Sequence, residues 1–215
     1  MENIRVKKHG KVKVKAETRK EIIYLLLIVD LFATLTVTYF GLFGYISKST
    51  ATYVGDIGLS FFFSLIVFSY LSAKGNSEHK IITVLGLGRF TRASVAYGLA
   101  IFIAMAAIEA LLTFLHANAF SIQAAPAYYL FFIAIIAPIN EEILFRGFLV
   151  PRVGIIASAL IFAIPHLVIY YSVYELAFAF AFGILAGYAF KKSGSLYSTI
   201  IAHMMVNILA VLLLI

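Results

Sequence analysis

The chain alternates between long apolar stretches and short polar segments. Seven apolar stretches occur, at residues 22–47, 52–73, 93–115, 127–150, 153–171, 174–190 and 195–215. Each is a continuous hydrophobic run close to the length of about 20 residues that a helix needs to cross a bilayer. A barrel strand would instead alternate apolar and polar positions. The pattern therefore predicts an all-α, polytopic membrane helix bundle with about seven transmembrane helices.

The composition supports a membrane protein and excludes several kinds of site. The chain is 63% hydrophobic and 13% charged, whereas a soluble domain carries about twice that share of charged residues. Of the 27 charged side chains, 11 lie in the first 21 residues, which leaves too few elsewhere to cover a water-exposed surface. The absence of cysteine excludes a disulfide framework, a thiolate metal site and a cysteine nucleophile. Residues 22–215 are therefore expected to form one transmembrane domain.

The basic residues predict the orientation of the chain in the cell membrane. Residues 1–21 hold eight Lys or Arg and three Glu, which favours a tail that attracts anionic lipid headgroups over one that binds nucleic acid. If this tail is cytoplasmic, 15 of the 17 basic residues fall on the cytoplasmic side of the seven spans. The sequence thus predicts a cytoplasmic N-terminus and a C-terminus on the other side.

Ionisable residues within apolar spans are costly and are therefore candidates for function. Asp30, Asp56 and Glu109 are isolated in the first three spans, and the sequence suggests no role for them. A second, polar group is concentrated in the last four spans: Glu141, Glu142, Arg146, His166, His203 and Asn207. With a helical rise of about 1.5 Å per residue, Glu141, both histidines and Asn207 are expected at similar depth, about 12 to 20 Å from the cytoplasmic ends of their helices.

Within this second group, helical spacing separates the two glutamates. Glu142 and Arg146 are four residues apart, so they share a helix face and can pair. Glu141 lies about 100° around the helix and remains available as a general base. Alternatively, all three form a buried network that only holds helices together. Pro138 is expected to free the backbone carbonyl of Ala134, four residues earlier.

The motifs carried by these residues resemble those of the CPBP family of intramembrane proteases. This family contains the CAAX prenyl endopeptidases and bacteriocin-processing relatives. The resemblance covers about residues 126–212. Its motifs are Glu141-Glu142-xxx-Arg146, Phe162-xxx-His166 and His203-xxx-Asn207.

The resemblance implies proteolysis within the membrane. Glu141 and His166 would activate a water molecule for attack on a peptide carbonyl, and His203 with Asn207 would stabilise the oxyanion. The substrate would be a membrane-associated peptide or protein, with prenylated CAAX-type proteins among the candidates.

The resemblance also implies roles for the remaining motif residues, but it does not decide whether the reaction requires a metal. Glu142 and Arg146 would orient and charge-balance the reacting pair. Glu141, His166 and His203 would suffice as ligands for one divalent metal such as zinc. The sequence favours a glutamate-activated water slightly, because no His-Glu-x-x-His motif is present.

Two other kinds of function are compatible with the same residues. A non-catalytic membrane scaffold, immunity factor or regulator would use the polar group for helix packing. A proton or ion carrier would use Asp30, Asp56 and Glu109 along its path. The carrier is disfavoured because no inverted repeat is evident and the polar residues are concentrated in the C-terminal half.

Overall fold

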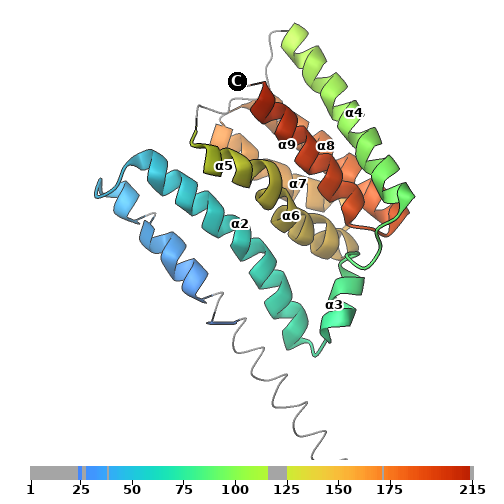
Figure 1. Cartoon of the computed structure of the whole chain (residues 1–215), viewed down its shortest axis with the longest axis horizontal. Coiled ribbons are helices and arrows are strands. Elements are labelled where there is room, and N and C mark those ends of the chain that lie inside the picture. Colours follow the sequence, from blue (N-terminus) through green and yellow to red (C-terminus); the bar gives the residue numbers. More distant parts are fainter. Residues whose placement is uncertain (1–23, 26–27, 38, 116–124, 171, 214–215) are drawn as a thin grey trace, which may run out of the picture. The chain divides into compact units, whose positions relative to one another are not determined.

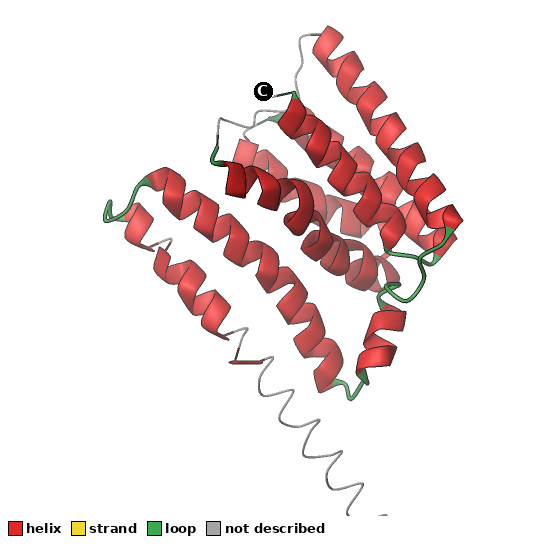
Figure 2. Cartoon of the chain, viewed as in Figure 1, coloured by secondary structure: helices red, strands yellow, loops and turns green. Residues whose placement is uncertain are grey.

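The computed structural model confirms the all-α prediction. It describes residues 24–25, 28–37, 39–115, 125–170 and 172–213. Within these ranges the regular elements are helices and none is a strand (Figure 2). The predicted basic tail at residues 1–21 lies outside the described residues.

The elements follow one another as α-helices, with two π-helical segments labelled η. They are α2 (Lys48–Ala73), α3 (Glu78–Val84), α4 (Arg92–Phe114), α5 (Ala127–Phe131), η1 (Phe132–Ile136), α6 (Ala137–Glu142), η2 (Ile143–Leu149), α7 (Val150–Tyr170), α8 (Val173–Ser193) and α9 (Tyr197–Leu212) (Figure 1).

Several of these helices are long and apolar enough to cross a membrane. Four helical stretches qualify by length and composition: Ser49–Ala73, Arg92–Phe114, Ala127–Leu167 and Val173–Ser193. The third spans 41 residues but is interrupted at Gly154, whose φ of 86° is non-helical, so it consists of two helical segments. Two shorter apolar helices, Ile28–Leu42 and Tyr197–Leu212, bring the apolar helical segments in the described residues to the predicted seven.

Capping residues explain where the helices of the C-terminal half begin and end. The Thr91 hydroxyl accepts the backbone N–H of Ser94 and forms a capping box at the start of α4. The Ser172 hydroxyl accepts the N–H of Glu175 at the start of α8. Gly194 ends α8 with a φ of 62°, a left-handed conformation that glycine adopts without strain. These punctuating residues explain why the apolar pattern located the helices to within a few residues.

The chain divides into two compact units, residues 1–81 and 82–215. In the first unit, the apolar helix Ile28–Leu42 lies closely against α2. A Cβ atom built on Gly58 would collide with the Thr34 side chain. Small residues at such positions let two membrane helices approach closely.

The second unit contains the polar motif residues and is packed through small residues. A Cβ atom built on Gly183 of α8 would lie 2.7 Å from the Cβ of Ala159 in α7. A Cβ atom on Gly98 of α4 would lie 2.9 Å from the Ile201 side chain in α9. α7 therefore packs tightly on α8, and α4 packs on α9. These contacts bring segments that are far apart in the sequence around α6.

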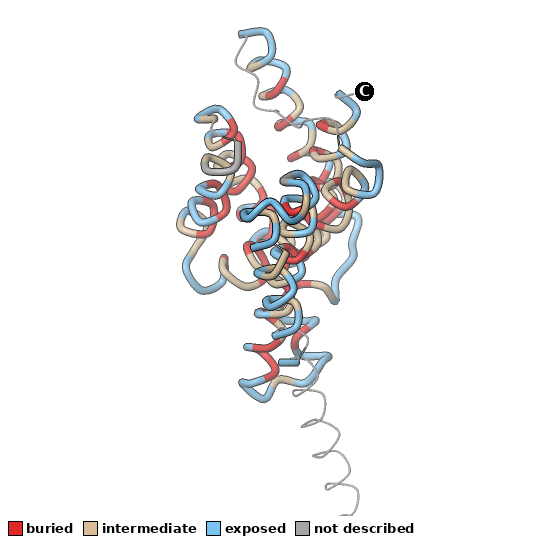
Figure 3. The backbone as a smooth tube through the Cα atoms, turned by 90° about the vertical axis from the view of Figure 1, so that its left-hand side faces the viewer, coloured by how far each residue is buried: buried red, intermediate tan, exposed pale blue. Residues whose placement is uncertain are grey.

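The outer faces of the helices are apolar, as a bilayer requires. Figure 3 shows exposed positions in pale blue beside buried positions in red along the helices. Large hydrophobic residues are among the exposed positions, including Ile103, Phe131 and Ile156. Because polar and ionisable motif residues lie on the inner faces instead, the second unit has the polarity of a membrane helix bundle.

Candidate active site

Glu141 and Glu142 lie at the end of α6, a six-residue α-helical piece between η1 and η2. In π-helical segments the backbone hydrogen bonds span five residues rather than four, and such segments occur frequently at functional sites. The glutamate pair is therefore carried by a helix whose register changes on both sides of it.

The change in register determines where Asn207 binds. In η1 the N–H of Ala137 reaches a carbonyl five residues earlier. The N–H that would reach the Ile133 carbonyl in the same way belongs to residue 138, which is a proline and has none. The Asn207 side chain donates Nδ2–H to this carbonyl at 2.8 Å. The prediction that Pro138 would free the Ala134 carbonyl assumed an α-helical register, whereas the π register of η1 leaves the Ile133 carbonyl without a donor from residue 138.

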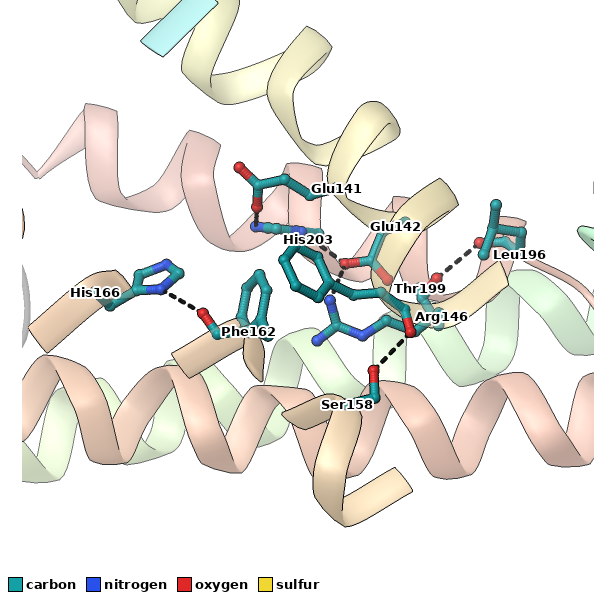
Figure 4. Close-up of polar contacts among 10 residues, drawn as sticks. Glu141, Glu142, Arg146, Ser158, Phe162, His166, Leu196, Thr199 and His203 are labelled. Carbon is teal, nitrogen blue, oxygen red and sulfur yellow. Dashed lines mark hydrogen bonds and ion pairs between the residues drawn. The ribbon is translucent and has the colours of Figure 1, made fainter. Parts of the chain in front are cut away.

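Glu142 is the centre of a buried polar cluster (Figure 4). Its side chain is 0% exposed, and Oε1 accepts a hydrogen bond of 2.7 Å from Arg146 Nη1. The same oxygen accepts a hydrogen bond of 2.8 Å from His203 Nδ1. The predicted pairing of Glu142 with Arg146 is thus present, and a histidine from α9 completes it.

The Arg146 guanidinium is covered by aromatic rings. Its carbon Cζ lies 4.3 Å from the ring centre of Phe162 and 5.0 Å from that of Phe182. Nη2 has no hydrogen-bond partner among the described residues. Aromatic faces attract a cation, and they do so more strongly in a desolvated site. The two rings therefore help to stabilise the positive charge of Arg146, which Glu142 compensates on one side.

Glu141 has a different environment from its neighbour. Its side chain is 23% exposed, and Oε2 lies 3.7 Å from His203 Nε2. This distance allows an ion pair but is too long for a hydrogen bond. His203 lies between the two carboxylates, so its ring can offset the negative charge that a single arginine leaves uncompensated.

His166 contacts the cluster through Phe162. The two rings lie 4.8 Å apart, and His166 Nδ1 is 3.0 Å from the Phe162 carbonyl. Since a carbonyl only accepts, Nδ1 carries the hydrogen, and the neutral ring keeps a lone pair on Nε2. The structure thus brings Glu141, Glu142 and His203 together, with His166 beside them across a shared aromatic ring.

The predicted metal ligands are not grouped as a metal site in this arrangement. Among the described residues, no three His, Asp or Glu side chains are grouped so that they could hold an ion. His203 directs Nδ1 to Glu142 and His166 directs Nδ1 to a carbonyl, and these bonds engage only one nitrogen of each ring. The function proposed below therefore uses no metal.

Three residues of the cluster were not singled out from the sequence as site residues. The Ser158 hydroxyl of α7 donates to the Phe145 carbonyl at 2.6 Å. Thr199 lies beside Glu142 in Figure 4 and donates to a backbone carbonyl of its own helix. Phe182 covers Arg146. Thr199 lies one helical turn before His203 and could have been found by that spacing, whereas nothing in the sequence distinguishes Ser158.

Away from the cluster, two further glutamates are buried in the second unit. Glu109 in α4 is 5% exposed, and Glu175 in the first turn of α8 is 7% exposed. The Oε2 atom of each has no hydrogen-bond partner among the described residues. The sequence analysis did not single out Glu175, although its position three residues after Ser172 matches the spacing of a capping box. Asp30 and Asp56 lie in the first unit.

Comparison with known proteins identifies the region that holds this cluster. Residues 123–209 match the family described as type II CAAX prenyl endopeptidase Rce1-like. No curated protein and no solved structure matches the chain. The matched residues include all three motifs on which the predicted resemblance rests, and the match confirms it. The chain has the long apolar helices of a membrane protein, and its residues 123–209 are similar to the type II CAAX prenyl endopeptidase Rce1-like family, which is a family of CAAX-type intramembrane proteases.

Proposed function

We propose that this chain is an intramembrane endopeptidase in which Glu141 activates the water that hydrolyses the peptide bond. The observation that carries the proposal is the difference between two adjacent carboxylates. Glu142 is 0% exposed and bound by Arg146 and His203, whereas Glu141 is 23% exposed. A held carboxylate beside an accessible one provides both the scaffold and the base for general base catalysis.

In the proposed reaction, Glu141 accepts a proton as the water oxygen attacks the substrate carbonyl. His166, with a lone pair on Nε2, assists in orienting this water, as the resemblance implies. When the tetrahedral intermediate collapses, the C–N bond breaks and the proton passes to the leaving amine. The products are a carboxylate and an amine, so no further reactant is consumed.

The oxyanion is proposed to be stabilised by His203 and Asn207. Because His203 Nδ1 already donates to Glu142, donation from Nε2 requires the imidazolium form, whose charge would lie between the two glutamates. Asn207 uses one amide hydrogen for the Ile133 carbonyl and has a second one to donate. Stabilisation of an oxyanion by fixed donors is commonly the largest single contribution to such reactions.

We propose a membrane-associated C-terminal peptide as the substrate, with a prenylated CAAX peptide as the first candidate. The family match supports this choice of substrate class. A cytoplasmic approach of the peptide would follow from the predicted topology, in which the N-terminal tail and the loop before α4 are on the cytoplasmic side.

The test is a cleavage assay with purified protein in lipid bicelles. Farnesylated and unprenylated versions of one CAAX peptide are compared with an unrelated membrane-bound peptide. We expect the wild type to release the C-terminal fragment and Glu141→Gln to lower kcat by about 10²- to 10⁴-fold. Glu109→Gln is the matched control, because it makes the same change at another buried glutamate, and it should leave kcat unchanged.

Each outcome separates the candidate functions. Wild-type rates in Glu141→Gln would contradict the proposed base. A folded wild type that cleaves no peptide would favour the scaffold or the carrier, and a loss of cleavage in Glu109→Gln would show that this glutamate also contributes to the reaction. Inhibition by a chelator, reversed by added zinc, would contradict the metal-free mechanism while leaving the protease in place.

A further inference from the structure

Ser158 is a buried hydroxyl residue in the second unit that the proposed reaction does not use. It lies in α7 and is 1% exposed. Its Oγ–H donates a hydrogen bond of 2.6 Å to the Phe145 carbonyl, across 13 positions in the sequence. The bond therefore connects two different segments, whereas most serines in membrane helices bond to a carbonyl of their own helix.

The accepting carbonyl belongs to η2, the π-helical segment that follows the glutamate pair. The Phe145 carbonyl also accepts the backbone N–H of Val150, five residues later, as the π register requires. The peptide unit of Phe145 leads directly into Arg146. A second donor on this carbonyl fixes the plane of that peptide unit and hence the direction in which the Arg146 side chain leaves the backbone.

From Arg146 a chain of contacts leads to the proposed base. Arg146 holds Glu142 Oε1 at 2.7 Å, and the same oxygen holds His203 Nδ1 at 2.8 Å. The other ring nitrogen of His203 then lies 3.7 Å from Glu141. Each link is made by a side chain that is at least partly buried, so a displacement at one end cannot be absorbed by solvent.

An equivalent bond exists on the other side of α6. There Asn207 donates to the Ile133 carbonyl of η1 at 2.8 Å. Both π-helical segments beside the glutamates are thus held at a carbonyl by a side chain from another helix. We propose that Ser158 is a positioning residue, which sets the Arg146–Glu142–His203 cluster and through it the orientation of Glu141. This inference rests on the proposed endopeptidase function.

The test compares Ser158→Ala with Ser198→Ala as the matched control. Ser198 is also fully buried, and its hydroxyl donates to the Ser195 carbonyl of its own chain segment at 2.7 Å, outside the cluster. Ser158→Ala loses one buried hydrogen bond, and Ser198→Ala loses its bond to Ser195 and a contact of 3.1 Å with the Ser193 hydroxyl, so the control should lose at least as much stability. We expect only Ser158→Ala to lower kcat about tenfold, with KM within about twofold, because small displacements of a base are costly. Ser158→Thr, which keeps the hydroxyl, should recover most of the rate.

A second readout does not require catalysis. In ¹⁵N-histidine NMR spectra, the ring nitrogens of His203 should shift in Ser158→Ala and stay unchanged in Ser198→Ala. If the wild type cleaves nothing, the proposed function fails, and the His203 spectrum still decides the positioning role. Equal kcat in the two alanine variants together with an unchanged His203 spectrum would overturn the inference.

Discussion

The helices of the second unit carry two pairs of glutamates, and the pairs differ in how their charge is compensated. Glu141 and Glu142 lie with Arg146 and His203 at the junction of α6, η2 and α9. The other group, Glu109 and Glu175, has no ion-pair partner among the described residues.

In this second group, the helices bring like charges near each other. α4 and α8 pack together, and the Glu109 carboxylate repels that of Glu175. Glu109 has a hydrogen-bond partner in the Thr113 side chain, one turn later in the same helix, while its Oε2 has none among the described residues. Within the part of the chain that the structure describes, no cation forms an ion pair with either carboxylate.

The comparison distinguishes a preorganised site from glutamates whose burial the fold merely tolerates at a cost in free energy. Removing a carboxylate from water costs several kcal/mol unless a partner compensates it. At Glu142 the compensation comes from two helical segments, with Arg146 in η2 and His203 in α9, which is the preorganisation that a reaction requires. At Glu109 and Glu175 no such group of charged partners converges among the described residues. The burial of a glutamate in a membrane helix therefore does not identify an active site, whereas convergent compensation does.

The largest effect is expected when the cation of the first group, the Arg146 guanidinium, is removed. Arg146→Met keeps a long side chain between Phe162 and Phe182 but leaves Glu142 buried without its partner. We expect the free energy of unfolding to fall by about 3–5 kcal/mol. The measurement is reversible unfolding in mixed micelles.

A double variant serves as the control for this prediction. Adding Glu142→Gln to Arg146→Met removes the uncompensated charge and should recover much of the lost stability. A single variant that is no less stable than the wild type would show that the Arg146 pair contributes nothing beyond its packing.

The aromatic cover of the arginine should have a smaller effect. Phe162→Leu keeps an apolar side chain but removes the ring face 4.3 Å from the guanidinium. We expect a loss of about 2 kcal/mol in unfolding free energy, from lost packing and from the lost cation–π attraction.

Phe190→Leu is the matched control for this prediction, since Phe190 is also buried but has no cation over its ring among the described residues. It should lose only the packing contribution. Equal losses in the two variants, measured in the same micelles, would mean that the ring faces do not stabilise Arg146.

Local spacing in the sequence was sufficient for the helices and for part of the site. Continuous apolar runs identified the spans, because the bilayer fixes their length. The step of four residues from Glu142 to Arg146 identified their ion pair, because both lie on one helical segment.

The other contacts of the candidate site depended on features that residue spacing does not encode. The π register of η1 leaves the Ile133 carbonyl for Asn207 to bind, and a pattern based on 3.6 residues per turn could not show this. The contact of Glu142 with His203 crosses 61 positions and is set by how α9 packs. Spacing within one helix could locate Glu142 and His203 on their own helices, but it could not show that the two side chains are in contact.

The smallest predicted effect has the opposite sign and concerns the uncompensated group. Glu175→Gln keeps the shape of a side chain that is 7% exposed, but it removes an ionisable carboxyl next to Glu109. We expect the free energy of unfolding to rise by about 1 kcal/mol at alkaline pH, where the unpaired carboxylate would otherwise be charged, because a neutral amide is easier to bury than an unpaired charge. Glu142→Gln makes the same change in the compensated group and should destabilise, since Arg146 would lose its counter-charge. If Glu175→Gln also destabilised, Glu175 would have a compensating contact, and the distinction between the two groups would not hold.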